Sequence, residues 1–358
     1  MAFQLKANES VSDGIRRNVR GQIEKARKHL GAKRKPHQRG AAENEPDPKE
    51  VRKSFKKVRA ALRLVREDLG NDVYREENLC FRDAGRLLRE VRDAMVLVES
   101  ADKLTSQEFP TSVEAGAFAK IREALLANQQ EVTRRVLDED RAVTAVEEVA
   151  NRALARLPDW RIKRDGWAAL ERGLRRTYRT GHRALALAAE NPTVLNLHEC
   201  RKQARHLRGQ LQLLEAAWTG SEKGLGDQTQ KLSQLLGDDH DLAILRETLA
   251  ADPLAYGGHR ILKGVFAVID RRREELERQA FTIGRKLYKD SPRVFTSRIE
   301  AYWKAWAAEI EAPKPPARSR QAQGRNVRSK DHRQKSEAPD AVIGGVSSSG
   351  GAAVDQSK

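Results

Sequence analysis

The chain has almost no cysteine and no long apolar run. Its 358 residues include two cysteines, Cys80 and Cys200, and neither belongs to a Cys-x-x-Cys pair. This usage argues against a disulfide scaffold or a cysteine zinc site and favours reduced thiols in the cytoplasm. No run reaches the ~18 apolar residues of a membrane span, and the N-terminus lacks the apolar core of a signal peptide. We therefore expect a cytoplasmic protein without a membrane partner.

Aromatic residues and strand signals are also scarce. Only 5% of the residues are Phe, Trp or Tyr, which leaves few rings for stacking on nucleic-acid bases. Alternating Val, Ile and Thr runs do not occur, whereas Ala, Leu, Arg and Glu dominate. This pattern predicts an all-α fold of long helices. Neither a P-loop nor a G-x-S-x-G elbow is present.

Positive charge, in contrast, is abundant. The chain has 68 Lys and Arg against 51 Asp and Glu, a formal net charge of +17. The last 46 residues hold nine Lys or Arg and four Asp or Glu, so they supply +5 and leave +12 for the rest. A surplus of this size predicts a polyanionic partner such as a phosphate polymer or nucleic acid.

Helix-breaking residues divide the chain. We expect a first helix capped by Ser10 or Ser12, a loop over residues 31–48, and long helical runs over residues 73–104 and 113–157. Pro158-Asp159 marks a boundary between two halves of one domain, residues 10–157 and 160–312 of 1–312. The remaining residues, 313–358, are rich in Pro, basic residues, Gly and Ser, and we predict that they are disordered.

A basic helix appears twice, as EVRKSFKKVRAALRLV in residues 50–65 and ECRKQARHLRGQLQLL in residues 199–214. Two further pairs of segments match in the same order, residues 14–20 with 173–179 and residues 87–97 with 235–245. Three matches in order predict an internal duplication. Each half has about four expected helices, the size of a four-helix bundle.

The cations of each basic helix share one face. At 3.6 residues per turn, Arg52, Lys56, Arg59, Arg63 and Arg66 fall within roughly 80° and extend over about 21 Å, apart from the apolar stripe. Guanidinium groups donate paired hydrogen bonds to phosphate, so such a row suits a chain of phosphates. The alternative is an ordinary solvated helix face.

The acidic sequence Asp238-Asp239-His240-Asp241 suggests a second possibility, a divalent metal site of a phosphohydrolase. The repeat places Arg92-Asp93 opposite His240-Asp241, however, and an arginine is not a metal ligand. We therefore favour Asp93 and Asp241 as groups that hold nearby basic side chains, with His240 as a partly titratable cation.

With these residues in view, the chain resembles the CHAD family, the conserved histidine α-helical domain. The resemblance covers residues 10–310 and rests on EVRKSFKKVRAALRLVR, CFRDAGRLLREVRDAMVLVE, GLRRTYRTGHRAL, LHECRKQARHLRGQLQLLE and LGDDHDLAIL. It implies two four-helix bundles related by a pseudo-twofold axis and a basic cavity between them that binds inorganic polyphosphate. The implied cavity residues are Arg16, Arg17, Arg20, Arg52, Lys53, Lys56, Arg59, Arg175, Arg176, Arg179, His198, Arg201, Lys202, Arg205 and Arg208.

One departure concerns the histidine that opens each basic helix in this family. His198 occupies that place in the second copy, but Lys49 occupies it in the first, so we include Lys49 as a phosphate ligand of fixed charge. The E-x-E-x-K strand of the CYTH triphosphatase, a frequent fusion partner, is missing. We therefore expect no hydrolase.

The sequence thus predicts a non-enzymatic polyphosphate-binding protein without a cofactor. The family resemblance also makes polyphosphate granules a plausible location, and the basic tail a plausible contact for other polyanions. A nucleic-acid-binding helical protein and the metal-dependent phosphohydrolase are the alternatives. The oligomeric state and the preferred polymer length stay open.

Overall fold

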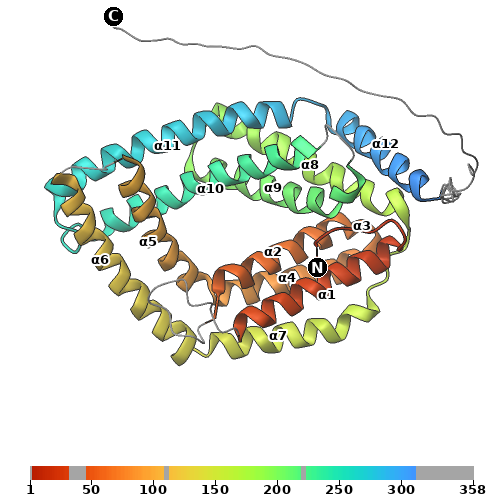
Figure 1. Ribbon diagram of the computed structural model, residues 1–358, viewed down its shortest axis with the longest axis horizontal. Coiled ribbons are helices and arrows are strands. Elements are labelled where there is room, and N and C mark those ends of the chain that lie inside the picture. Colours follow the sequence, from red (N-terminus) through yellow and green to blue (C-terminus); the bar gives the residue numbers. More distant parts are fainter. Residues whose placement is uncertain (1, 32–45, 109–112, 219–222, 312–358) are drawn as a thin grey trace, which may run out of the picture. The chain divides into compact units, whose positions relative to one another are not determined.

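The computed structural model describes residues 2–31, 46–108, 113–218 and 223–311, and within them every regular element is a helix (Figure 1). The all-α prediction is confirmed. The described residues all belong to one unit of internal contacts. The predicted disordered tail, most of the loop at residues 31–48 and the break near residues 109–111 lie outside the described residues.

The first helices begin at local capping signals. In α1 (Val11–Leu30), the Ser10 hydroxyl accepts a 3.0 Å hydrogen bond from the Asp13 amide, as its position in the sequence predicts. In α2 (Pro48–Leu64), Asp47 caps the amides of Lys49 and Glu50. The one-turn α3 (Arg66–Leu69) follows α2 and leads into α4 (Asn71–Leu87). The apolar stripe of α2 is buried, and α2 packs on α1 and α4.

Two expected long helices are interrupted. The run at residues 73–104 is divided at Leu88 into α4 and α5 (Arg89–Glu108), because α4 packs on α2 and α7 whereas α5 turns toward α6 and α10. The run at residues 113–157 contains α6 (Val113–Arg134), a π-helical turn (Arg135–Glu139) and α7 (Ala142–Arg156). The chain changes direction at Arg141, whose φ of 51° is left-handed.

The second half contains α8 (Gly166–Glu190), α9 (Val194–Leu213), α10 (Lys223–Ala251), α11 (His259–Leu287) and α12 (Pro292–Glu311). Short 3-10 turns lie at Leu157–Asp159 and Glu215–Ala217. Along this half, α8 packs on α9, α9 on α10, and α10 on α11, while α12 covers α8. No helix in the described ranges has an apolar stretch long enough to cross a bilayer.

The two basic helices, α2 and α9, pack directly on each other. Gly209 makes this approach possible, since a Cβ atom there would lie 2.6 Å from the Cβ of Ala60. Gly173 does the same for α8, where a Cβ atom would lie 1.9 Å from the carbonyl oxygen of Leu64. These close crossings fix the relative position of the two cationic helix faces.

Candidate functional site

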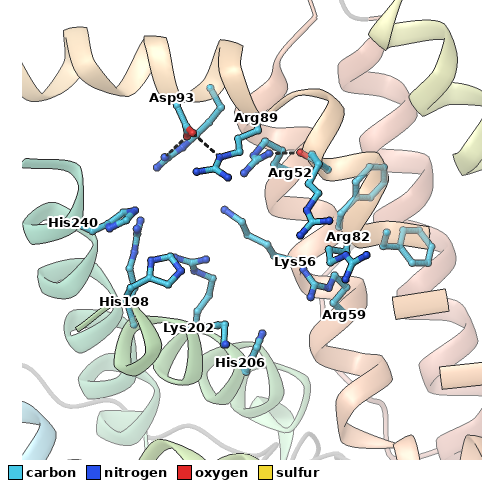
Figure 2. A pocket seen from close by; sticks show the side chains of 17 residues that line it. Arg52, Lys56, Arg59, Arg82, Arg89, Asp93, His198, Lys202, His206 and His240 are labelled. Carbon is cyan, nitrogen blue, oxygen red and sulfur yellow. Dashed lines mark hydrogen bonds and ion pairs between the residues drawn. The ribbon is translucent and has the colours of Figure 1, made fainter. Parts of the chain in front are cut away.

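A cavity of about 340 Å³ opens beside the contact of α2 with α9 and is lined almost entirely by cations (Figure 2). Among the described residues its lining includes ten arginines and lysines, three histidines and one carboxylate, that of Asp93. The formal balance of Arg, Lys and Asp is therefore +9. The lining residues are Arg52, Phe55, Lys56 and Arg59 of α2; Phe81, Arg82, Gly85 and Arg86 of α4; Arg89, Arg92 and Asp93 of α5; His198, Arg201, Lys202, Arg205 and His206 of α9; and His240 of α10.

The α2 wall carries three cations on successive turns. Arg52 donates through Nη1 to the carbonyl oxygen of Gly85, and Arg59 donates through Nε to Oδ1 of Asn78 at 3.0 Å. Lys56 extends between them toward the open centre (Figure 2). The charged groups that most affect Lys56 are all arginines, so its ammonium faces like charge.

The α9 wall combines arginines with imidazoles. Arg201 is 7% exposed, and its guanidinium lies 3.6 Å from the carboxylate of Asp241. The rings of His198 and His240 lie 4.9 Å apart between centroids, so the opening histidine of α9 meets a histidine of α10. Lys202 at the edge pairs with Glu199 one turn earlier.

Carboxylates hold the arginines of α5 and α9 in place. Asp93 accepts hydrogen bonds from Arg92 at 2.9 Å and from Arg89 at 3.1 Å. Asp241 lies 3.4 Å from Arg92 and thus joins α5 and α9 through α10. The prediction that Asp93 and Asp241 position basic side chains is confirmed.

The neighbouring acids are also engaged by cations. Asp238 accepts a 3.1 Å hydrogen bond from Lys103, and buried Asp239 accepts one of 2.8 Å from Arg273. The part of the chain that the structure describes contains no group of three or more His, Cys, Asp or Glu suited to hold a metal ion. The four-residue acidic motif therefore serves several separate ion pairs.

Burial and repulsion lower the pKa values of several cavity cations on α2 and α9. Burial lowers the pKa of Arg52 to about 10 against the opposing charge of Asp93, and burial together with the charge of Arg201 lowers that of Arg205 to about 9. Burial also lowers the pKa of Arg59 to about 10 and brings that of Lys56 well below its ordinary value. Arg92 is an exception, because Asp241 and Asp93 outweigh its burial and raise its pKa. The arginines remain charged near neutral pH, which makes the empty cavity electrostatically unfavourable.

The same environment lowers the pKa values of the three cavity histidines. Burial, followed by the charges of neighbouring arginines, lowers the pKa of His198, brings that of His206 well below 6.5 and lowers that of His240 to about 3. His240 is therefore a neutral imidazole in the empty cavity, not the partly titratable cation that the sequence suggested. A bound anion would favour protonation of all three rings.

Two buried donors in the cavity lack an acceptor. The Nε groups of Arg52 and Arg201 are inaccessible to solvent and have no hydrogen-bond partner within the described residues. Leaving a buried donor of this kind unpaired costs about 1–3 kcal/mol. The arrangement therefore suits a ligand that brings several oxygen acceptors.

The structure brings seven of the sixteen predicted ligands together in this cavity: Arg52, Lys56, Arg59, His198, Arg201, Lys202 and Arg205. These are the members of the two basic helices that lie on the sides of α2 and α9 facing α4, α5 and α10. Arg208, one turn further along α9, instead donates to Gln230 at 3.1 Å. Lys53 pairs with Glu50, and Lys49 pairs with Glu99 at 2.9 Å, outside the lining.

The arginines of α1 and α8 lie elsewhere. Arg16 pairs with Asp13 at 2.8 Å, Arg17 forms hydrogen bonds with Glu9, and Arg20 is exposed. In the glycine-arginine motifs, Gly14 lies against Leu5 and Glu9 of the N-terminal segment and Gly173 against Leu64 of α2, and the arginines that follow them do not line the cavity. Arg175, Arg176 and Arg179 of α8 line a separate, more open hollow together with Glu67 and Arg172.

Sequence reasoning missed the contribution of α4 and α5. Arg82, Arg86, Arg89 and Arg92 all line the cavity, as does His206 of α9. A signal was present, because Arg82 and Arg86 stand four residues apart and the next two follow at intervals of three. The turn at Leu88, which aims both helices at one space, was not visible in that spacing.

Comparisons with known proteins identify the family of this chain. The family model of the CHAD domain matches residues 20–250. The crystal structure of the CHAD domain from the plant Ricinus communis is similar, with a TM-score of 0.46 and 14% sequence identity over 85% of this chain and 95% of that one. No curated protein matches the sequence.

Proposed function

The chain belongs to the CHAD domain family, and from this premise we propose that its cationic cavity binds inorganic polyphosphate without cleaving it. The observation that carries the proposal is the lining itself, in which ten arginines and lysines face a single carboxylate. Each phosphate that enters supplies oxygen acceptors and negative charge. Binding would relieve the repulsion among the cations and release counterions, so affinity should fall as salt rises.

The cavity favours a thin polyanion over nucleic acid. Its volume of about 340 Å³ has no room for a duplex, whose major groove alone is about 12 Å wide. Its two aromatic residues, Phe55 and Phe81, are at most 1% exposed and pack on each other, so they offer no free face for base stacking. A phosphate chain needs only the cations.

Binding without hydrolysis is the second element of the proposal. Asp238, Asp239 and Asp241 are occupied by lysine and arginine partners, which leaves little negative charge to attract Mg²⁺. We place the protein in the cytoplasm, where polyphosphate granules would supply the ligand. The basic tail is a candidate contact for further polyanions.

We also propose that the domain arose by duplication into two four-helix bundles. Support comes from the repeated sequence blocks and from the two basic helices, α2 and α9, which pack on each other and both line the cavity. On this view the ligand would lie between two copies of one ancestral cationic helix.

A competition assay tests the function. Labelled long-chain polyphosphate is bound at a fixed salt concentration and challenged with unlabelled polyphosphate, duplex DNA or RNA, with Mg²⁺ present and chain length followed on gels. We expect polyphosphate to compete best and to stay intact. Stronger competition by nucleic acid refutes the assignment, and shortening of the chain that Asp241→Ala abolishes indicates a hydrolase.

A matched pair of variants locates the binding. Arg52→Ala with Arg201→Ala removes two charges from the cavity, whereas Arg75→Ala with Arg183→Ala removes two from exposed positions on α4 and α8. We expect at least a tenfold loss of affinity in the first pair only, since hydrogen bonds to charged groups contribute about 1.5–3 kcal/mol each. Equal effects of the two pairs would place the binding outside the cavity.

A further inference from the structure

The cationic stripe of α2 continues past the cavity into α3. Its last two members, Arg63 and Arg66, do not line the large cavity but a second one of about 140 Å³. The remaining lining comes from Tyr74 of α4, Gln203 of α9, and three residues of α8: Arg176, Thr177 and Thr180. Five helices, α2, α3, α4, α8 and α9, thus converge on a small space that contains three arginines and, among its described lining residues, no carboxylate.

Neutral groups hold two of these arginines. Arg63 donates through Nη1 to the hydroxyl of Tyr74 at 2.7 Å. Arg66 donates through two nitrogens to Oδ1 of Asn71, each at 3.1 Å, and its guanidinium lies 4.6 Å from the centre of the Tyr74 ring. These contacts orient both guanidinium groups without neutralising them.

The third arginine has one acidic contact. Arg176 pairs through Nη2 with Glu67, which lies outside the lining of this cavity. Its Nη1 group is buried without a hydrogen-bond partner in the described structure, and so is the Nε group of Arg63. Two unpaired guanidinium donors on arginines that line one small cationic space favour an acceptor that carries negative charge.

The small cavity lies next to the large one along the same helices. Arg59 of the large cavity and Arg63 of the small one are one turn apart on α2, an axial distance of about 6 Å. On α9, His206 and Gln203 are also one turn apart and belong to the two cavities respectively. The charge of Arg63 contributes to the low pKa of His206, which reflects this proximity.

We propose that Arg63, Arg66 and Arg176 form a second subsite for a phosphate group, beyond the large cavity on the α2 stripe. If the phosphate is part of a polyphosphate chain whose remainder occupies the large cavity, the proposal rests on the proposed function. The same three arginines suit free orthophosphate, which has the same chemistry. The two sources differ in their dependence on chain length.

The test uses the full chain and the variant Arg66→Gln with Arg176→Gln. Arg75→Gln with Arg183→Gln serves as the matched control, because both residues are exposed and line neither cavity. Calorimetry measures the affinity for polyphosphates of graded length, and thermal melting measures stabilisation by orthophosphate at constant ionic strength. Circular dichroism verifies the fold, and Arg66→Gln alone leaves the Arg176–Glu67 pair intact if the double variant does not fold.

We expect the subsite variant to bind short chains like the wild type and to lose about tenfold in affinity for long chains, as expected for lost charged hydrogen bonds. Loss of stabilisation by orthophosphate, with unchanged affinity for chains, also supports the subsite and identifies free phosphate as its ligand. Wild-type behaviour of the variant in both measurements overturns the proposal. If the wild type binds no chain, the proposed function fails, and the orthophosphate measurement alone then decides on the subsite.

Discussion

Arg205 is expected to make the empty protein less stable while it strengthens ligand binding. It is partly buried in the wall of the cavity, and the like charges of Arg201, Arg92 and Arg52 act on it. Asp241 offsets only part of this repulsion. Replacement by methionine, as Arg205→Met, keeps much of the side-chain volume and removes the charge.

The size of the effect follows from the pKa of Arg205, which burial and then Arg201 lower from 12.5 to about 9. At about 1.4 kcal/mol per pH unit, this fall corresponds to an upper bound of about 5 kcal/mol of electrostatic cost in the folded state. Solvent in the open cavity screens part of it, so we expect Arg205→Met to raise the free energy of unfolding by about 1–2 kcal/mol.

The sign of this effect on stability can be verified by varying the pH. Because the folded protein binds this proton more weakly than the unfolded chain, the cost is fully present below pH 9 and disappears as pH rises from there toward 12.5. At pH 7 the variant should therefore be more stable than the wild type. Its affinity for polyphosphate should nevertheless fall about tenfold or more, since one charged hydrogen-bond donor is lost.

The assay combines urea denaturation without ligand and calorimetric titration with polyphosphate at several salt concentrations. The slope of log affinity against log salt concentration should become shallower by the amount expected for the loss of about one phosphate contact. Arg75→Met on the exposed face of α4 is the control and should change neither quantity appreciably. A variant that is destabilised and binds with unchanged affinity would refute the view that Arg205 is held in place for an anion.

Three further predictions concern protons, ion pairs and packing. Binding should take up protons, because a bound phosphate raises the lowered pKa values of Lys56 and the cavity histidines. The affinity should therefore rise as pH falls through about 6.5. Calorimetric titrations in buffers of different ionisation enthalpy measure the protons taken up, and no uptake would contradict this prediction. Asp68→Asn should lower the free energy of unfolding by about 1–3 kcal/mol, because buried Asp68 accepts hydrogen bonds of 2.7 and 2.8 Å from partly exposed Arg164. Urea denaturation measures the change, and an unchanged unfolding midpoint would refute it. Gly173→Ala should cost about 1–3 kcal/mol in the same assay by forcing α8 away from Leu64, and wild-type stability would show that the contact can relax.

Helical periodicity predicted the cationic face of α2 correctly, because the apolar and charged positions of one helix are separated by local geometry alone. Arg52, Lys56 and Arg59 were selected in this way, and all three line the cavity. Periodicity does not specify which neighbours a helix face meets. Arg63 belongs to the same stripe but enters a different cavity, because α8 crosses α2 at Leu64 through Gly173.

The arginines of the first helix show a second limit. Arg16 and Arg17 match the repeat, yet each is paired with an acid that lies three or eight residues away, Asp13 or Glu9. Those acids are visible in the sequence, but only the fold of residues 2–10 brings Glu9 to Arg17. What the two segments share in the structure is a glycine at a close contact, Gly14 with Leu5 and Gly173 with Leu64, and not a set of cavity ligands.

The two basic helices share the cations at their centres but differ at the flanking positions. At the offset of 149 residues, Arg52 corresponds to Arg201 and Lys56 to Arg205, and all four line the cavity. The flanking positions diverge, because His198 lines the cavity whereas its counterpart Lys49 pairs with Glu99 outside it.

Among the described residues, the imidazoles that line the cavity, those of His198, His206 and His240, all come from the second half. Fixed charge comes from the arginines of both halves, whereas the groups expected to gain a proton on binding are Lys56 of α2 and the histidines of α9 and α10. A phosphate chain would thus meet arginines of fixed charge along its length and one end, that of the histidines, whose charge changes in mildly acidic solution. It follows that acidification should strengthen contacts at the His198–His240 end and leave those of Arg52 and Arg201 unchanged.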